Sequence, residues 1–484
     1  MEGAQRKRLF ILCDGTWQDG VNSNCRLTNV ATFARCLDQV SPHDGCLQLV
    51  YYDCGVGNGT NRVTEAIDGA TGRGISAKIR NAYSFISHNY NFDSVDSDQP
   101  DEIILVGFSR GAFAVQCLAA FINDIGLLQS QDLYFLRGLF TLWSNKNFKR
   151  WGPGASNPVN AKLQEYVPRM RSDHEEKLLY QVKIKALLVW DTVSALGLPV
   201  QVSAIPLSFV GKSVPANVEN AFQALALDER RQKFKPRVWI SQAPENQRVK
   251  QCWFLGTHAD IGGNGDAALG AVTLLWMLGQ LKDAGIKVGI RNFEVGKHLR
   301  QKYLKWDFDI NTVFGQLKEK SVLSSTAGHG KPTNPAPYWW LLGMKNRARY
   351  LALANRVPNM EIHFSVRLAL GRGATSRLLK GSKTEFVDNR VVWTVDGTRI
   401  HECELAESEE TANRYAEFDE YNWIIAWYRG RFADQLTTRS GFAQEFRGLV
   451  LVNGISRGKL DDFVKMLQDN VKFQGGRLAP SIML

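Results

Sequence analysis

The sequence predicts an α/β fold built on a doubly wound, mostly parallel sheet. Two observations lead to this prediction: short apolar runs alternate with amphipathic segments, and each run is followed by Gly or Asp. This is the pattern of strands that alternate with crossover helices. The predicted strands cover residues 9–13, 47–52, 103–106, 184–190 and 251–255. Because the carboxyl ends of parallel strands share one edge of a sheet, the turns after them predict where functional groups gather.

Helices are predicted between the strands and after the last of them. Thr28 or Asn29 is a candidate N-cap for the first helix, and Gly126 is a candidate cap at the end of the third. The predicted helices cover residues 28–37, 75–90, 112–123, 217–227 and 267–281. Beyond residue 290 the pattern is weaker, and it predicts strands at 362–370 and 391–394, helices at 423–432 and 459–471, and a proline-rich loop at 328–338.

The composition is that of a globular protein with an excess of positive charge. The 484 residues are 44% hydrophobic and 22% charged, which excludes wholesale disorder and allows one large domain with additions. A net charge of +11 favours acidic partners such as anionic lipid headgroups, phosphoesters or nucleic acid. A basic soluble enzyme without such a partner is the alternative interpretation.

The cysteines and the apolar runs bear on compartment and on membrane insertion. The eight cysteines include no C-x-x-C pair, so the sequence predicts a reducing compartment, with no zinc site and no disulfide framework. Only five apolar residues follow the basic N-terminus before Asp14, too few for a signal peptide. No apolar run is long enough for a spanning helix. A cytoplasmic protein without metal or cofactor is therefore predicted, with peripheral membrane association and leaderless export left open.

The predicted strand at 103–106 and the helix after it are joined by Gly107-Phe-Ser109-Arg-Gly111, a G-x-S-x-G sequence. In a nucleophile elbow this sequence turns sharply from strand to helix and holds the serine in a strained conformation. Glycines flank the serine because a Cβ there would clash with the neighbouring strand and helix. The apolar strand before the turn and the apolar helix after it favour an elbow over an ordinary βα turn that contains serine.

Ser109, Asp191 and His258 each follow a predicted strand, in the chain order Ser, Asp, His expected for α/β hydrolases. A serine hydroxyl is a poor nucleophile near neutral pH unless an imidazole takes its proton. A carboxylate must hold the other ring nitrogen so that the imidazole has the right tautomer. The sequence therefore predicts Ser109 as nucleophile, His258 as base and Asp191 as the acid that orients the base.

Two further carboxylates are secondary candidates for the site. Asp260 competes with Asp191 for the orienting role, but it lies only two residues from His258. A side chain that close on a tight loop rarely reaches Nδ1 of the same imidazole, so Asp191 is favoured. Asp14 ends the first predicted strand, at the same edge of the sheet.

The oxyanion hole is predicted from backbone donors around the elbow. The first donor is the N–H of Arg110, which follows the nucleophile at the positive end of the helix dipole. The second is expected from Gly15 or Thr16, in the turn after the first strand.

The chain is predicted to divide into a catalytic domain at residues 1–370 and a C-terminal extension at residues 371–484 that packs on or beside it. Residues 127–180 are a basic, aromatic-rich helical excursion, where hydrolases of this architecture carry a cap or lid; a helical insertion packed on the sheet is the alternative. Residues 194–210 are apolar but interrupted by Gly and Pro, so they cannot span a membrane. They could line an acyl pocket, touch a membrane surface or form a buried connecting loop.

Seven ordered motifs resemble a family of α/β-hydrolase domains, with bacterial and fungal members, that includes the family-one phospholipase effectors of type VI secretion. They are CDGTW at 13–17, YYDCGVG at 51–57, GATGRG at 69–74, GFSRGAF at 107–113, VWDTV at 189–193, ALALDERR at 224–231 and WFLGTHADIGG at 253–263. The resemblance covers residues 8–370 and implies Ser109 as nucleophile, Asp191 as triad acid and His258 as base. It also implies lipid ester hydrolysis of the phospholipase A type. The sequence departs from the family at Gln116, where Arg is usual, and after residue 370, where it does not resemble the effectors' membrane-binding modules.

Two classes of function are compatible with these features. The first is a serine hydrolase, whether phospholipase, lipase or esterase, that cleaves an ester substrate through an acyl-enzyme on Ser109. The alternative is a catalytically weak protein on a hydrolase fold that binds partners or an anionic membrane surface, although such a scaffold needs no Ser, Asp and His together. Nucleic-acid binding is not expected, because no zinc pattern, ribonucleoprotein motif or aromatic-interleaved basic stripe accompanies the positive charge.

Overall fold

The computed structural model of the protein describes residues 5–15, 27–54, 73–145, 158–172, 178–193, 207–289 and 347–403, apart from short gaps at 96, 208, 232–233, 241–243, 358, 372–374 and 388–389. It also describes two short paired strands, β13 (Phe473–Gln474) and β14 (Arg477–Leu478). The predicted loop at 328–338, the predicted helices at 423–432 and 459–471, and most of the apolar stretch at 194–210 lie outside the described residues.

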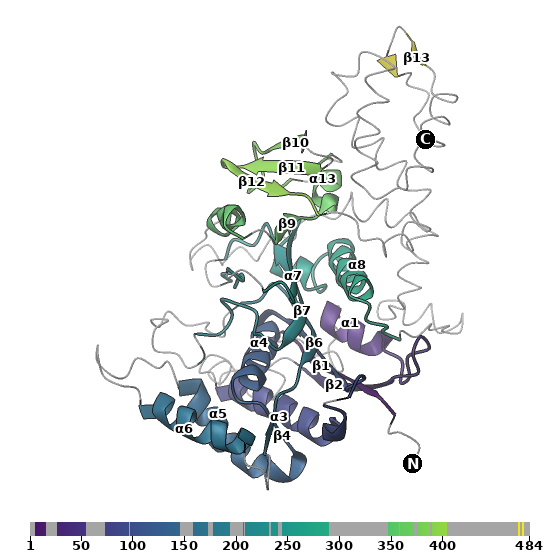
Figure 1. Ribbon diagram of the computed structural model, residues 1–484. Coiled ribbons are helices and arrows are strands. Elements are labelled where there is room, and N and C mark those ends of the chain that lie inside the picture. The colour runs from purple at the N-terminus through teal and green to yellow at the C-terminus, as the bar shows by residue number, and fades with distance from the viewer. Residues whose placement is uncertain are drawn as a thin grey trace, which may run out of the picture.

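A seven-stranded sheet forms the centre of the protein (Figure 1). Its strand order is β2-β1-β3-β6-β7-β8-β9, and each neighbouring pair is parallel. The strands are β1 (Lys7–Cys13), β2 (Leu47–Asp53), β3 (Glu102–Phe108), β6 (Ile184–Trp190), β7 (Val218–Ala226), β8 (Arg248–Phe254) and β9 (Met360–Ile362). The five strands predicted from apolar runs are all present; β7 lies between β6 and β8, and β9 forms the edge next to β8.

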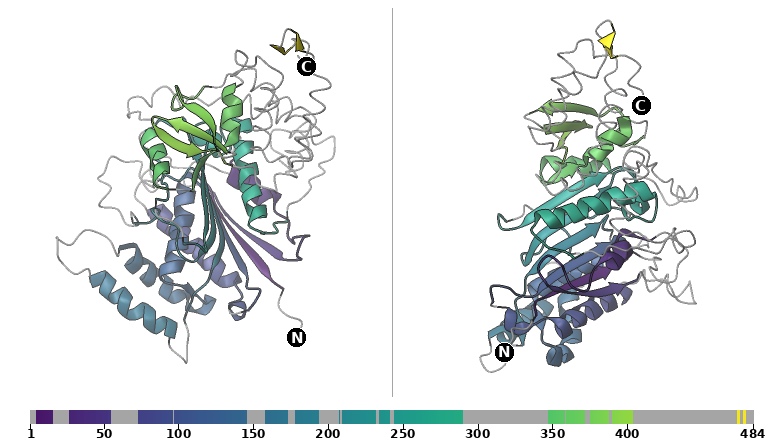
Figure 2. Two further views of the ribbon diagram at one scale, coloured as in Figure 1. Left: turned by 45° about the horizontal axis from the view of Figure 1, so that its top comes forward. Right: turned by 90° about the vertical axis from the view of Figure 1, so that its right-hand side faces the viewer.

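Helices cover both faces of this sheet, as the doubly wound prediction requires (Figure 2). One face carries α3 (Arg73–Asn89) and α4 (Ser109–Asp124), and the other carries α1 (Asn29–Cys36) and α8 (Ala267–Asp283). The N-cap of α1 is Thr28, whose hydroxyl accepts a hydrogen bond from the N–H of Ala31. Two short helices, η1 (Phe92–Ser94) and α7 (His258–Ile261), precede β3 and follow β8.

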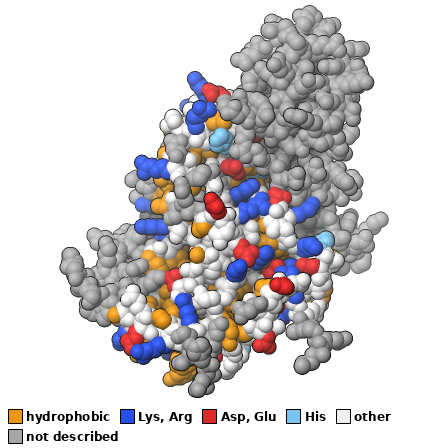
Figure 3. All heavy atoms as spheres, in the orientation of Figure 1, with side chains coloured by type: hydrophobic (Ala, Val, Ile, Leu, Met, Phe, Trp, Pro, Cys, Tyr) orange, Lys and Arg blue, Asp and Glu red, His pale blue; other side chains and the backbone are white. Residues whose placement is uncertain are grey.

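One face of the protein carries both signs of charge. On the face shown in Figure 3, Lys and Arg side chains are interspersed with Asp and Glu rather than gathered in one patch. Such mixing gives little long-range attraction for a polyanion on this face. Among the described residues, no helix combines the length and hydropathy needed to cross a membrane.

The described part of the excursion between α4 and β6 is helical, and its contacts lie at the far end of α4 from the elbow. It contains β4 (Leu127–Leu128), η2 (Ser130–Phe135), α5 (Leu136–Asn145), α6 (Pro158–Ser172) and β5 (Leu179–Tyr180). The indole N–H of Trp143 and the guanidinium of Arg171 both donate to Asp124, the last residue of α4. That helix is about 24 Å long, so these contacts are remote from Ser109 at its other end. The described part of the excursion is therefore a helical insertion on α3 and α4, and the predicted cap is not confirmed.

Two predicted elements are wrong in type. The helix expected at 217–227 is the central strand β7 (Val218–Ala226), which is buried along almost all of its length. The strand expected at 362–370 is only the end of β9, and α13 (Phe364–Gly371) follows it. The segment at 217–227 is rich in helix formers, and the segment at 362–370 begins with alternating apolar and polar residues, which is the period of a strand. In both segments the local pattern therefore indicated the wrong element.

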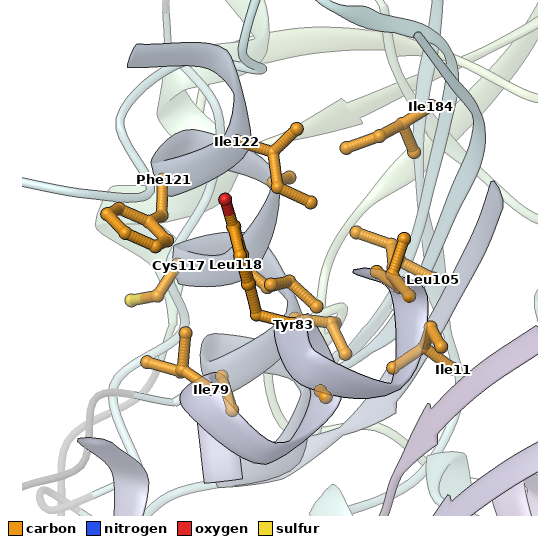
Figure 4. Packing of buried hydrophobic residues seen from close by; sticks show 14 of the residues in the cluster. Ile11, Ile79, Tyr83, Leu105, Cys117, Leu118, Phe121, Ile122 and Ile184 are labelled. Carbon is orange, nitrogen blue, oxygen red and sulfur yellow. The ribbon is translucent and has the colours of Figure 1, made fainter. Parts of the chain in front are cut away.

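The core is divided by the sheet into two layers. In β1, Leu9 and Ile11 belong to the cluster that contains α3 and α4, whereas Phe10 and Leu12 belong to the cluster that contains α1 and α8. Figure 4 shows Ile11 on the side of α3 and α4, near Tyr83 of α3. Because successive strand residues face opposite sides, a strand buried on both faces must be apolar throughout. This is why the strands were visible as uninterrupted apolar runs.

A third cluster joins the C-terminal part to the end of the sheet. A three-stranded antiparallel sheet packs there, formed by β10 (Lys383–Val387), β11 (Arg390–Val395) and β12 (Thr398–His401). The cluster includes Trp253 of β8, Ile362 of β9 and Trp393 of β11. Two short helices, α12 (Ala348–Leu351) and η5 (Ala352–Asn355), lead into β9. Residues on both sides of position 370 therefore share one apolar core.

Candidate active site

Ser109 stands at the junction of β3 and α4, in the conformation that the elbow predicts. It is the first residue of α4, and its φ of +58° lies in the left-handed region that residues other than glycine rarely adopt. The preceding Phe108 is extended, so the chain reverses from strand to helix at the serine itself. Strain of this kind persists only when the surrounding structure holds it in place.

The glycines beside Ser109 let the elbow approach its neighbours closely. A Cβ on Gly107 would lie 2.6 Å from Cα of Ala112 in α4. A Cβ on Gly111 would lie 2.1 Å from the carbonyl oxygen of Cys13 and 2.5 Å from that of Asp14, at the end of β1. All three distances are shorter than any van der Waals contact, so the steric reason predicted for the two glycines is confirmed.

The structure brings Ser109, His258 and Asp191 into one hydrogen-bonded chain. Nε2 of His258 lies 2.8 Å from Oγ of Ser109, and Nδ1 lies 2.6 Å from Oδ2 of Asp191. The three side chains come from the carboxyl ends of β3, β8 and β6, and all three residues are buried. With the ring proton on Nδ1, that nitrogen donates to the carboxylate and Nε2 is free to accept the serine proton.

Asp260, the competing carboxylate, faces the start of its own helix. Its Oδ2 accepts from the backbone N–H and the hydroxyl of Thr257, each at 2.8 Å, and its Oδ1 accepts from the N–H of Asp266 at 2.8 Å. Thr257 and Asp260 form a capping box at α7, the helix that begins with His258. Asp260 therefore fixes the backbone that carries the imidazole, while Asp191 contacts the ring.

A profile of the family described as "T6SS, Phospholipase effector Tle1-like, catalytic domain" matches residues 7–280, more than half of the chain. The chain belongs to this family. Two solved structures are similar to the chain. One is the Tle1 effector bound to the VgrG spike from the type VI secretion system, with 14% identity, a TM-score of 0.34, and coverage of 69% of this chain and 82% of that chain. The other is an uncharacterized protein from Pseudomonas aeruginosa, with 13% identity, a TM-score of 0.35, and coverage of 97% and 68%.

A search of curated protein sequences gave no match. The range that matches the Tle1-like family contains Ser109, Asp191 and His258, together with the motifs that suggested the family from the sequence. The predicted membership is therefore confirmed. Among the described residues, no group of three or more His, Cys, Asp or Glu side chains is arranged to hold a metal ion.

Arg347, beyond the range that matches the Tle1-like family, binds the same carboxylate as His258. Its Nη1 donates to Oδ1 of Asp191 at 2.5 Å, and its Nη2 donates to Oδ2 at 3.0 Å. The backbone N–H of Ala226 also donates to Oδ1, at 3.1 Å. Burial alone would raise the pKa of Asp191, but the Arg347 charge and the His258 hydrogen bond outweigh it and hold the pKa well below its usual range. Asp191 is therefore anionic throughout the physiological pH range.

Nothing in the sequence distinguishes Arg347 beforehand. It stands beside Lys345 and Arg349 in the weakly patterned region beyond residue 290. Basic residues in such a run are usually solvated, and this one is only 2% exposed. Only the folded chain shows that the residue lies beside β6.

Aromatic rings and a second carboxylate surround His258. The rings of Phe108 and Phe234 lie 4.7 and 4.9 Å from the imidazole, measured between ring centroids. The guanidinium of Arg231 stacks on Phe234 at 3.6 Å and forms an ion pair with Glu229 at 2.7 Å. Glu229 in turn accepts the backbone N–H of His258 at 3.3 Å. Glu229 and Arg231, from the charged run at 228–231 to which the sequence assigned no role, thus support the surroundings of the imidazole.

Asn29 holds the loop after His258 against α1 and α8. Its Nδ2 donates to the carbonyl oxygens of Ile261 and Gly270 and to the hydroxyl of Thr273, at 2.9–3.1 Å. Its backbone N–H donates to the carbonyl of Gly262 at 2.8 Å. The sequence suggested Asn29 only as a helix cap, and the observed cap is Thr28.

The predicted oxyanion donors differ in their positions. Arg110 lies in the first turn of α4, where backbone N–H groups have no intrahelical acceptor. Gly15 is close to Ser109, because a Cβ built on it would lie 3.3 Å from Cβ of that serine. However, the N–H of Gly15 donates to Oδ1 of Asp14 at 2.7 Å, so it is already engaged. Thr16 lies outside the described residues.

Asp14 is buried beside this turn and does not join the triad. Its Oδ2 accepts from the hydroxyls of Thr28 and Tyr52, at 2.6 and 2.7 Å. Burial raises the pKa of this carboxyl to about 6, although those hydrogen bonds act in the opposite direction. A carboxylate this deeply buried costs the folded protein stability at neutral pH.

We expect the stability of the protein to depend on pH through Asp14. Because the folded pKa is above the unfolded value, the group stabilises the fold below about pH 4, and this contribution is lost as the pH rises through about 6. The side chain of Asp14→Asn cannot titrate. The free energy of unfolding of this variant, relative to that of wild type, should therefore increase by a few kcal/mol as the pH rises from 4 to 7. Urea unfolding at several pH values measures this difference, with Asp98→Asn as the exposed control. A difference that stays constant with pH would contradict the assignment.

Proposed function

We propose that the protein is a serine hydrolase that cleaves carboxylic esters of lipids, most simply as a phospholipase. The observation that carries the proposal is the hydrogen-bonded chain from Ser109 Oγ through His258 to Asp191. Membership of a family of phospholipase effectors supports a lipid ester as substrate and a hydrolytic reaction.

The proposed reaction proceeds through an acyl-enzyme. Ser109 Oγ attacks the ester carbonyl carbon while Nε2 of His258 takes the hydroxyl proton, and Asp191 stabilises the imidazolium that forms. The negative charge on the former carbonyl oxygen lies at the N-terminus of α4, where the N–H of Arg110 is the proposed donor. The imidazolium then gives its proton to the leaving alkoxide. Water, deprotonated by the same imidazole, attacks the acyl group and releases the acid and free Ser109.

We propose a catalytic domain at residues 1–370 with residues 371–403 packed against it. The third apolar cluster, which includes Trp253, Ile362 and Trp393, supports this arrangement. Ion pairing between Arg367 of α13 and Glu402 after β12 also crosses the boundary, with nitrogen–oxygen distances of 2.6 and 2.8 Å. Both side chains are fully buried. The extension thus contributes to the core that holds β8 and β9.

The test of the proposed function is labelling of Ser109 by a serine-directed phosphonate. Wild type should be labelled, and Ser109→Ala should not be, because the phosphonate requires the activated hydroxyl. Ser144→Ala, which removes a similarly buried serine from α5, should be labelled like wild type. Mass spectrometry of mixed-lipid vesicles should then show fatty acid release that falls by several orders of magnitude in Ser109→Ala. Labelling that survives this substitution would remove Ser109 from the mechanism.

A further inference from the structure

We propose that Arg347 is a positioning residue of the active site, which fixes the carboxylate of Asp191 in the orientation and charge state that His258 requires. The inference rests on the proposed function, because it concerns the same triad. It goes beyond the family match, which ends at residue 280. It makes the triad depend on a segment outside the matched catalytic domain.

The geometry of the contact is that of a fixed clamp. Both terminal nitrogens of Arg347 reach Asp191, one to each carboxylate oxygen. The same nitrogens donate to the carbonyls of Ala226 at 2.9 Å and Phe234 at 2.6 Å. A planar guanidinium held at four acceptors has one orientation, and it imposes that orientation on the carboxylate. Oδ2 is then directed at Nδ1 of His258, 2.6 Å away.

Arg347 also connects Asp191 to two further residues, Ala226 and Phe234. Ala226 ends β7, next to β6 that carries Asp191, and Phe234 packs its ring against His258. An ion pair that only stabilised the fold would not need to involve a residue, such as Phe234, that contacts His258. Loss of Arg347 is therefore expected to change how the triad titrates as well as how stable the fold is.

The charge state of the acid is the second part of the argument. Asp191 is 0% exposed, so without a cation its burial would favour the protonated form. A protonated Asp191 is a poor acceptor for the Nδ1 proton and cannot balance an imidazolium. The other charged groups that face His258 are Glu229 and Arg231, which pair with each other. Among the described residues, Arg347 is thus the cation that pairs with Asp191.

The experiment compares Arg347→Met and Arg347→Lys with wild type over pH 5 to 9. The rate of phosphonate labelling and kcat/KM for a soluble ester are measured at each pH. In Arg347→Met the acid limb of both profiles should move to higher pH by about one unit or more, because the buried Asp191 carboxylate then keeps its proton to higher pH. Arg347→Lys keeps the charge and should move the limb less. Arg367→Met breaks a comparable buried ion pair remote from the triad and should lower stability without moving the limb.

An unfolding measurement gives a readout that does not depend on catalysis. In a Ser109→Ala background, thermal unfolding of the Arg347 and Arg347→Met proteins is compared at pH 5 and 8. With Arg347, the folded pKa of Asp191 is below the unfolded value, so its contribution is present above about pH 4. With Met at position 347, burial places the folded pKa of Asp191 above its unfolded value, so the contribution of Asp191 to stability is lost as the pH rises. The stability deficit of Arg347→Met should therefore grow from pH 5 to 8, and adding Asp191→Asn should abolish that growth.

The outcomes are distinct. An unmoved acid limb together with a stability deficit that is the same at both pH values would overturn the role of Arg347. If wild type hydrolyses no ester and no phosphonate labels Ser109, the proposed function fails, and the unfolding measurement alone still decides whether Arg347 sets the charge state of Asp191.

Discussion

We expect Asp191→Asn to lower kcat by about four orders of magnitude. The amide has one oxygen, whereas the carboxylate accepts from His258, Arg347 and the N–H of Ala226. When the amide oxygen accepts from the guanidinium, its NH₂ faces Nδ1 of His258, which must then act as an acceptor. The ring proton moves to Nε2, which donates to Ser109 and can no longer take its proton. Steady-state kinetics on a soluble ester measures the loss.

The same substitution leaves Arg347 buried without its counter-charge. Removing one partner of a buried ion pair costs about 3–5 kcal/mol of stability, so denaturant unfolding has to accompany the kinetics. Asp260→Asn is the matched control, since it alters a buried carboxylate that caps α7 without touching the ring. It should cost about 1 kcal/mol of stability and keep kcat within about tenfold. If Asp191→Asn is folded and its kcat is close to that of the control, Asp191 does not orient the imidazole.

The strands and the triad could be predicted for the same physical reason. A parallel strand covered by helices on both faces must be apolar over its buried length, and β1, β3 and β6 each contain an uninterrupted apolar run of at least four residues. The residue after such a strand lies at the carboxyl edge of the sheet, where Ser109, Asp191 and His258 meet. Position at a strand end and chain order were enough to select them from the many Ser, Asp and His residues of the sequence.

The central strand β7 escaped prediction because its sequence favours a helix. The segment 218–226 contains Ala, Glu, Gln and Leu, all strong helix formers, and few β-branched residues. Its small side chains suit the space between β6 and β8, and Gln223 bonds to the carbonyl of Arg237 at 2.8 Å and to Gln251 at 3.2 Å. Tertiary packing therefore overrode local propensity, which a single sequence does not show.

Two features of the site depend on contacts between distant segments. Arg347 reaches Asp191 across 156 positions, and no pattern in its own neighbourhood marks it. Gly15 was predicted as an oxyanion donor from its place after β1, and it does lie beside Ser109. The direction of its N–H, toward Asp14, is set by the backbone of the turn and not by residue type. Spacing predicts which residues approach each other, but not which way a peptide group faces.

Gly111→Ala should destabilise the protein by about 3 kcal/mol or more and reduce phosphonate labelling at least about a hundredfold in the folded fraction. The added methyl carbon would lie 2.1 Å from the carbonyl oxygen of Cys13 and 2.5 Å from that of Asp14. These are backbone atoms at the end of a buried central strand, so they cannot rotate away as a side chain would. Helix α4 must then shift away from β1, and Ser109 moves with it. Urea unfolding and the labelling rate measure the two effects.

Gly138→Ala is the control that separates this clash from helix propensity. Gly138 lies inside α5, is exposed, and would have nothing within 4 Å of an added Cβ. There alanine should stabilise the protein by about 0.5–1 kcal/mol, because it is the better helix former. Gly111 is also a helical residue, so propensity alone predicts a gain at both positions. Opposite signs at the two glycines would show that the close approach of α4 to β1 sets the geometry of the nucleophile, whereas a gain at Gly111 would refute it.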